Sequence, residues 1–214
     1  MGKKRVLFGL LAGSFFALSA FAAEGTLGKQ KAAACSGCHG EDGNSVSPLF
    51  PRLAGQYPDY LKSQLLAFKA ADRSDESMQA MAQGLDDSAI EAVSQYYAEK
   101  SALFSSEEDQ YLDEDEDIEV TEELVAAGKI LYLSGNKKSG VTACLACHGA
   151  DGLGNKPANF PVIKGQYAFY VAKTLRDFQS GERPNDRALM MSSLAERMTA
   201  EEINSVAAYI STMR

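Results

Sequence analysis

Apolar side chains recur every three or four residues in four stretches of the chain, which is the spacing of one face of a helix. Two stretches lie in the first half and two in the second: Tyr60 to Phe68, Ile90 to Tyr97, Tyr170 to Phe178 and Ile203 to Ile210. No run alternates convincingly between apolar and polar residues, as a half-buried strand does. The pattern predicts an all-α fold of short helices joined by loops that carry Gly and Pro.

The second half of the chain repeats the first. Residues 50–57 lie over residues 160–167 at an offset of 110, and a pair of apolar helical stretches follows each segment. The later helix of each pair is preceded by a capping residue, Asp86 or Thr199, and Glu202 completes a capping box with Thr199. Such a repeat predicts two tandem domains related by internal duplication.

Composition and charge exclude some classes of function. The chain has 214 residues, of which 45% are hydrophobic and 23% charged, so one or two globular domains are expected. The formal net charge is −8, which lacks the basic surface that a phosphate backbone needs, and we expect no nucleic acid partner. Four Cys and two His exclude a dense disulfide scaffold and leave few groups for binding metal.

The N-terminus has the parts of a secretory signal. Basic residues at positions 3–5 precede an apolar run over residues 6–16, and Ala20 and Ala22 fit the cleavage pattern of small residues. We expect residues 1–22 to be removed as a signal peptide and the mature chain to reside in the periplasm. An uncleaved N-terminal anchor is the alternative.

An acidic segment separates the repeats. Residues 101–128 carry eleven acidic side chains and no basic one. We expect a solvated linker over residues 105–119, between an N-terminal domain of residues 23–104 and a C-terminal domain of residues 120–214. A docking or repelling surface for a charged partner is the alternative interpretation.

Each domain carries one Cys-x-x-Cys-His motif, the attachment signal of a c-type haem. Cysteines three residues apart on a helical turn face the same side, so each can form a thioether with one porphyrin vinyl group while the following His lies under the iron. The motifs use every Cys and His of the chain: Cys35, Cys38 and His39 in the first copy, and Cys144, Cys147 and His148 in the second. We therefore expect two covalently bound haem c groups.

Three other interpretations fit parts of these motifs. A zinc site needs four ligands in a closed arrangement, and a thioredoxin-like dithiol needs a βαβ context. A disulfide within either motif leaves the paired His residues unexplained. The haem interpretation accounts for all six residues.

Each iron then needs a sixth ligand, and no His remains. Met is the natural candidate, and the mature chain offers six. Met78 and Met191 occupy equivalent positions in the repeat, each seven residues before the residue that precedes a helix cap. We predict Met78 and Met191 as the ligands. Met81, Met190 and Met198 have no matching Met in the other copy and are expected to pack in the core, with Met81 and Met190 as the alternative ligands.

The surroundings of the haems are less fully specified. A loop proline carbonyl is expected to orient each proximal His, and there are four candidates: Pro48, Pro51, Pro157 and Pro161. Arg73 and Arg183 are equivalent in the repeat, and each either pairs with a haem propionate or is a solvated Arg at a helix end. Four tyrosines are expected mainly in the core: Tyr57, Tyr60, Tyr167 and Tyr170.

These features resemble the cytochrome c4 family of dihaem cytochromes c. In each half a Cys-x-x-Cys-His motif is followed by Phe-Pro-x-x-x-Gly-Gln-Tyr, a helix, a Met near an Arg-Ser-Asp or Arg-Pro-Asn-Asp stretch, and a closing amphipathic helix. The resemblance spans essentially the whole mature chain. It implies two class I cytochrome c folds facing one another, with His/Met ligation at both irons.

The resemblance also implies a function. The expected protein is a periplasmic carrier that passes one electron at a time by outer-sphere transfer towards a terminal oxidase, and is often held at the membrane surface. Its expected donor is a quinol:cytochrome c reductase or another redox protein, and no small-molecule substrate is expected.

Two alternatives belong to other classes. One is a dihaem electron-accepting subunit of a dehydrogenase or flavocytochrome complex. The other is a haem enzyme such as a peroxidase, which needs an open coordination site. The matched Met in each half counts against the enzyme.

Overall fold

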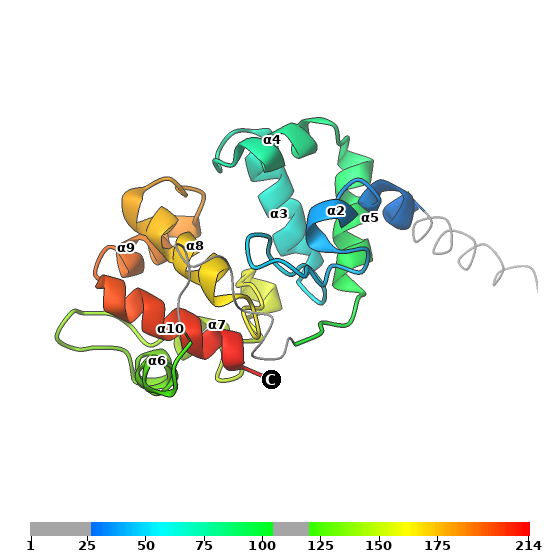
Figure 1. Ribbon diagram of the computed structural model, residues 1–214. Coiled ribbons are helices and arrows are strands. Elements are labelled where there is room, and N and C mark those ends of the chain that lie inside the picture. Colours follow the sequence, from blue (N-terminus) through cyan, green and yellow to red (C-terminus); the bar gives the residue numbers. More distant parts are fainter. Residues whose placement is uncertain (1–26, 105–119) are drawn as a thin grey trace, which may run out of the picture.

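The computed structural model describes residues 27–104 and 120–214, which form two helical bodies side by side (Figure 1). The predicted signal peptide, residues 1–22, and the predicted linker, residues 105–119, lie outside the described residues. Each body corresponds to one copy of the sequence repeat.

The N-terminal body is built around two helices that pack against each other. Its elements are the helical residues 27–32, α2 (Ser36–His39), α3 (Pro58–Lys69), α4 (Glu76–Gln83) and α5 (Asp87–Ala98). The Asp86 side chain accepts a hydrogen bond from Ala89 N at the start of α5, as its capping position predicts. The core joins α3 and α5 to the first helix: Ala32, Leu61, Val93, Tyr96 and Tyr97.

The C-terminal body repeats this plan with longer loops. Its elements are α6 (Glu122–Ser134), α7 (Leu145–His148), η2 (Lys156–Ala158), α8 (Ala168–Ser180), η3 (Arg187–Leu189), α9 (Met190–Ala195) and α10 (Ala200–Thr212). The capping box of Thr199 and Glu202 is present at the start of α10, which confirms that prediction. Ile203, Val206 and Ile210 of α10 lie in a core to which α6 and α8 also contribute.

In each body the first helix crosses the last at a glycine. A Cβ atom on Gly128 would lie 1.9 Å from Ser205 O in α10, and one on Gly28 would lie 2.6 Å from Ala92 O in α5. Both distances are far below van der Waals contact, so only Gly allows the backbones to approach so closely. The two crossings are equivalent, as the duplication requires.

The all-α prediction is confirmed. Outside the helices, the pairing found in the described residues consists of isolated bridges, Asn136 with Val141 and Asn155 with Phe160. Among residues 27–104 and 120–214, no helix combines the length and apolar character needed to cross a bilayer.

The two bodies meet through crosswise hydrogen bonds from the repeated Gly-Gln-Tyr segment. Gln56 Nε2 donates to Val162 O at 2.8 Å, and Gln56 Oε1 accepts from Val162 N at 3.0 Å. Gln166 makes the same pair of bonds with the backbone of Arg52, at 3.1 and 3.0 Å. Because positions 52 and 162 are equivalent in the repeat, the interface has approximate twofold symmetry.

The four tyrosines near this segment also reach across the boundary. Tyr57 Oη donates to Leu153 O at 2.8 Å, and Tyr167 Oη donates to Ser45 O. Tyr60 and Tyr170 are bonded to arginines of the opposite body. The core prediction is confirmed for Tyr167, which is buried, and wrong for the other three, which are partly exposed. Their apolar spacing showed a packed face, but the surface that covers it belongs to the other domain.

Candidate cofactor site

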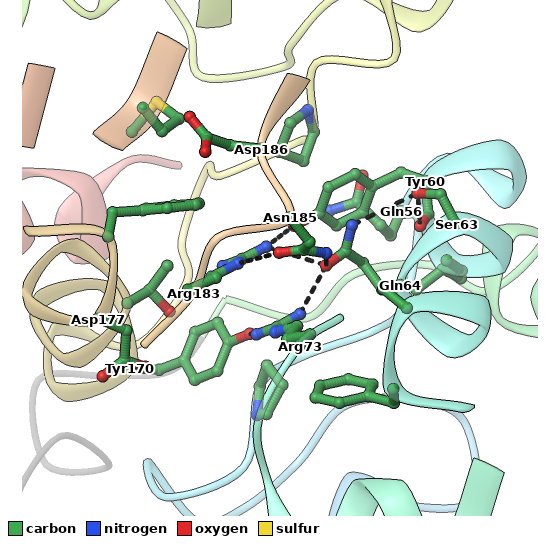
Figure 2. Close-up of a pocket in the computed structure, with 18 of the residues that line it drawn as sticks. Gln56, Tyr60, Ser63, Gln64, Arg73, Tyr170, Asp177, Arg183, Asn185 and Asp186 are labelled. Atoms are coloured by element: carbon green, nitrogen blue, oxygen red, sulfur yellow. Dashed lines mark hydrogen bonds between the residues drawn. The ribbon is translucent and has the colours of Figure 1, made fainter. Parts of the chain in front are cut away.

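A continuous cavity of about 1840 Å³ runs through both bodies. Both Cys-x-x-Cys-His motifs contribute to its wall, and polar side chains line it where the bodies meet (Figure 2). Pockets for one small molecule usually measure roughly 300–1,000 Å³. This cavity therefore has room for more than one such group.

Each motif forms a single helical turn, α2 or α7. The first Cys of each motif is the N-cap residue, and its carbonyl accepts a hydrogen bond from the N–H of the motif His, at 3.0 Å in the first copy and 2.9 Å in the second. Cys35 and Cys144 are partly buried, whereas Cys38 and Cys147 are exposed. The turn brings both sulfurs and the ring of each motif to the cavity wall.

The orientation of each His ring is fixed by one backbone carbonyl. His39 Nδ1 lies 3.0 Å from Pro51 O, and His148 Nδ1 lies 3.1 Å from Pro161 O. Because a carbonyl can only accept, Nδ1 carries the proton and Nε2 keeps a free lone pair. Of the four candidate prolines, the structure thus selects Pro51 and Pro161.

Burial keeps both imidazoles neutral. It lowers the pKa of His39 and of His148, and this effect outweighs the hydrogen bond to the proline carbonyl, which acts in the opposite direction. A neutral ring with an unprotonated Nε2 is the form that ligates a metal.

All four candidate methionines line the cavity. Met78 in α4 and Met191 in α9 are partly buried, whereas Met81 and Met190 are each 40% exposed. The prediction that Met81 and Met190 pack in the core is therefore wrong, because helical spacing alone does not distinguish the wall of a cavity from a core. Met198 is 5% exposed and lies in the core, as predicted.

The two copies differ in the loop that leads to the Met. Asp75 caps α4 by accepting from Met78 N at 2.9 Å. In the second copy, Ala188 and Leu189 precede Met190 and Met191 with φ values of 55° and 56°. The left-handed region is unfavourable for residues with a side chain, so the second Met follows a strained segment.

Two of the alternative interpretations of the motifs, the disulfide and the zinc site, have no support among the described residues. All four cysteines are free, so neither motif forms a disulfide. Within residues 27–104 and 120–214, no group of three His, Cys, Asp or Glu side chains is arranged to hold a metal ion, as a zinc site requires.

The cavity suits two haem groups. Each half brings two Cys thiols, the neutral imidazole of the motif His and a Met thioether to a cavity wall that is largely apolar.

Sequence reasoning missed Gln56, Gln64 and Gln166 as functional candidates. Gln56 and Gln166 were visible only as part of the repeat. Gln64 gave no signal, because Thr174 occupies its equivalent position. These three side chains connect the walls of the cavity across the domain boundary.

Comparisons with known proteins agree with this site. The family model described as cytochrome c matches residues 26–99 and again residues 125–214. Cytochrome c4 of Azotobacter vinelandii is 36% identical over 88% of this chain and 89% of its own length. The crystal structure of reduced recombinant cytochrome c4 from Pseudomonas stutzeri superposes with a TM-score of 0.78 at 32% identity, covering 89% of this chain and 98% of that one. A thiosulfate dehydrogenase electron acceptor of Stutzerimonas stutzeri (strain A1501) is 33% identical over 85% of this chain and 80% of its own length.

Proposed function

Because the chain belongs to the cytochrome c4 family and is an electron-transfer protein with two covalently bound haem c groups, we propose which of its residues hold each haem. Cys35 and Cys38 would hold the first haem through thioethers, and His39 and Met78 would ligate its iron. Cys144 and Cys147 would hold the second haem through thioethers, and His148 and Met191 would ligate its iron. When bound, each haem supplies a reversible one-electron change at iron.

The observation that carries this assignment is the matched pair of oriented imidazoles in one cavity. Pro51 O and Pro161 O each hold Nδ1 of a motif His, so both rings present Nε2 in the same way. Such a partner fixes the orientation of a metal-ligating His and raises its basicity. Fixed ligands in an apolar wall exclude water and limit rearrangement when the electron arrives.

Met78 and Met191 are assigned over Met81 and Met190 for two reasons. They are equivalent in the repeat, and they are the less exposed residue of each pair. A Met ligand stabilises the reduced iron and raises its potential.

The chain acts as a carrier and not as an enzyme. With a His and a Met assigned to each iron, no coordination position is left for a small molecule. Rapid binding of carbon monoxide by the reduced protein at one haem would contradict this assignment and would favour a peroxidase-like enzyme.

A dihaem electron-accepting subunit is the second candidate function. It is favoured by the similarity to a protein named as an electron acceptor of thiosulfate dehydrogenase. A tight stoichiometric complex with a dehydrogenase in pull-down would support it, whereas a free carrier would exchange electrons without co-purifying.

The proposed location is the periplasm, after removal of residues 1–22. The mature chain comprises domains at residues 23–104 and 120–214 with an acidic linker at residues 105–119. Its partners are a quinol:cytochrome c reductase or another donor and a terminal oxidase, with association at the membrane surface. N-terminal sequencing that returned Met1 would contradict the cleavage.

Paired cysteine variants test the haem assignment. We expect wild-type protein from a host that matures c-type cytochromes to contain two haems per chain in an alkaline pyridine assay. Replacing Cys35 and Cys38 by Ser should leave one haem, and replacing Cys144 and Cys147 should leave the other. A variant that kept both haems would overturn the assignment of that motif.

A further inference from the structure

Two arginines lie side by side where the two bodies meet. Arg73 follows α3 and Arg183 follows α8, at equivalent positions of the repeat. Arg183 is 5% exposed and Arg73 is partly buried. Both residues line the cavity that carries the two motifs. Cationic side chains are rarely buried unless they are paired with an anion.

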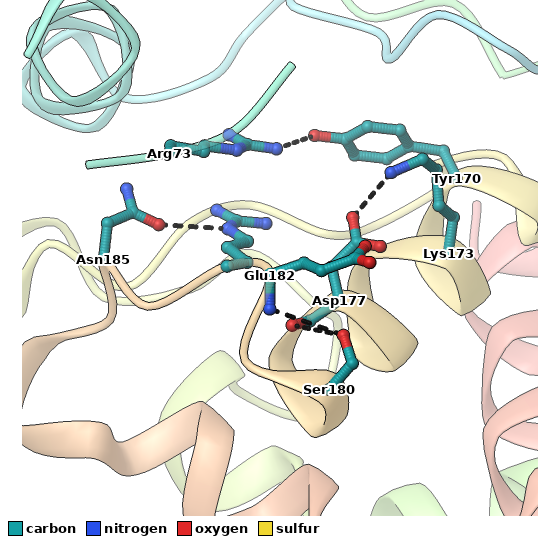
Figure 3. Close-up of polar contacts among 8 residues, drawn as sticks. Arg73, Tyr170, Lys173, Asp177, Ser180, Glu182 and Asn185 are labelled. Carbon is teal, nitrogen blue, oxygen red and sulfur yellow. Dashed lines mark hydrogen bonds and ion pairs between the residues drawn. The ribbon is translucent and has the colours of Figure 1, made fainter. Parts of the chain in front are cut away.

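Each guanidinium is bonded to the opposite domain. Arg73 Nη2 donates to Tyr170 Oη at 2.9 Å, and Arg183 Nη2 donates to Tyr60 Oη at 2.8 Å. Figure 3 shows the first of these contacts. The guanidinium of each domain thus contacts a Tyr of the other domain.

The two guanidiniums also share one neutral acceptor. Gln64 Oε1 accepts from Arg73 Nη1 at 2.9 Å, from Arg183 Nη2 at 3.1 Å and from Asn185 Nδ2 at 3.1 Å (Figure 2). A carbonyl oxygen has two lone pairs, so three donors exceed its capacity. Two positive charges therefore converge on an oxygen that carries no net charge.

No carboxylate of the described residues forms an ion pair with either arginine. Asp177 lies near the cluster, but its carboxylate is bonded to Lys173 Nζ at 2.7 Å (Figure 3). Burial raises the pKa of Tyr170, but the charges of Arg73 and Arg183 and the hydrogen bonds with Arg73 and Thr174 together bring it below its ordinary value. Two like charges that share one neutral acceptor repel each other unless an anion compensates them.

Carboxylates of the two haems would supply the compensating anions. A haem carries two propionates, and the arginines lie where the two halves of the cavity meet. Arg pairs strongly with carboxylates because its donors match both oxygens. One propionate from each haem would balance the two arginines.

We propose that Arg73 and Arg183 form one shared electrostatic site, so that each arginine sets the reduction potential of both haems and not only that of its own domain. This inference rests on the proposed function, because it requires a haem in each half. The reduced iron carries one positive charge fewer than the oxidised iron, so a nearby cation favours reduction. Both arginines bond to Gln64 and to a Tyr of the opposite domain, and both line the cavity that the two motifs share, so each charge would act on both haems.

Spectroelectrochemical titration of single variants tests the proposal. Arg73→Gln and Arg183→Gln should each lower both midpoint potentials, since each removes one positive charge from the shared site. Arg176→Gln is the matched control, because Arg176 is an exposed arginine of α8 that donates to Asn204. It should leave both potentials unchanged.

A second variant separates charge from loss of structure. Gln64→Glu keeps both arginines and supplies a carboxylate between them, so both potentials should again fall. If an arginine variant fails to fold, the potentials of Gln64→Glu still test whether charge at this site acts on both haems.

The haem content of the wild type is measured first. Fewer than two haems per chain would overturn the proposed function, and this inference with it. If two haems are present but each arginine variant shifts the potential of only one, the shared site is wrong while the proposed function stands. Unchanged potentials in Gln64→Glu would also overturn it.

Discussion

The two proximal histidines show how much one backbone hydrogen bond determines. The bond from Nδ1 to a proline carbonyl fixes the tautomer of His39 and His148, and burial keeps each ring neutral. The same proline follows the Phe of each repeat, so Pro51 and Pro161 serve both as loop residues and as partners of the proposed ligands. Replacing a proposed Met ligand would therefore leave the hydrogen bond that orients each His in place.

If Met78 and Met191 each ligate one iron, each single Met variant should lose the absorption band of one haem. Met78→Ala and Met191→Ala should each abolish about half of the sulfur-to-iron band near the red edge of the visible spectrum, because each removes one thioether ligand. Absorption spectroscopy of the oxidised protein measures the band. Met81→Ala and Met190→Ala are matched controls from the same cavity wall and should leave it intact. A full band in Met78→Ala or Met191→Ala would transfer the ligand role to a neighbour.

Among the helices and loops, the capping box of α10 also connects this helix to a distant loop. Glu202 Oε2 accepts from Thr199 N at 2.9 Å, while Oε1 accepts from Asn136 Nδ2 at 2.7 Å and from Ser139 Oγ at 3.0 Å. Asn136 and Ser139 lie in the loop between α6 and the second motif, where the second copy is longer than the first. One carboxylate thus joins this loop to the helix that closes the domain.

Because of the Glu202 carboxylate, we expect the folded protein to lose stability in acid. Burial acts to raise the pKa of Glu202, but its hydrogen bonds lower it below the ordinary 4.5. The ionised Glu202 therefore stabilises the folded protein fully at a pH above 4.5, its ordinary pKa, and this stabilisation is lost as the pH falls through the lowered pKa of the folded state. Glu202→Gln should reduce the free energy of unfolding by about 1 kcal/mol at neutral pH, and by less in acid.

Urea unfolding followed by circular dichroism at neutral and acidic pH measures this difference. Glu201→Gln is the matched control, since Glu201 is the exposed neighbour in the same first turn. An equal effect of both variants would indicate a general interaction with the helix dipole instead of the specific hydrogen bonds.

At the scale of the whole molecule, duplication has produced an interface as well as two domains. The Gly-Gln-Tyr segment that repeats in the sequence is the segment that crosses the boundary in both directions. Because each Gln satisfies both backbone groups of one residue in the other domain, its loss leaves a donor and an acceptor unpaired. The two cofactor sites are held in a fixed relation by these contacts.

The interface predicts that the domains unfold together. Replacing both Gln56 and Gln166 by Ala should split one thermal transition into two, since each unpaired backbone group costs about 1–3 kcal/mol. Differential scanning calorimetry measures the transitions, and the haem content should not change. Gln95→Ala on the exposed face of α5 is the control and should preserve one transition. A single unchanged transition in the double variant would show that other contacts hold the domains together.

Features that depend on residues close together in the chain could be predicted without the structure. The two Cys-x-x-Cys-His turns, the helix caps at Asp86 and Thr199 and the duplication were all readable, because covalent spacing fixes which side chains share a helical turn. The all-α fold followed from the same local periodicity and was confirmed.

Contacts between residues far apart in the chain could not be predicted and were revealed by the structure. It selected Pro51 and Pro161 among four prolines, and it placed three of the four tyrosines, all but the buried Tyr167, in partly exposed positions at the interface. It also brought Gln64 to Arg183, which lies 119 residues away in the chain. Such contacts depend on how two folded domains pack, and a periodic apolar face does not specify what will cover it.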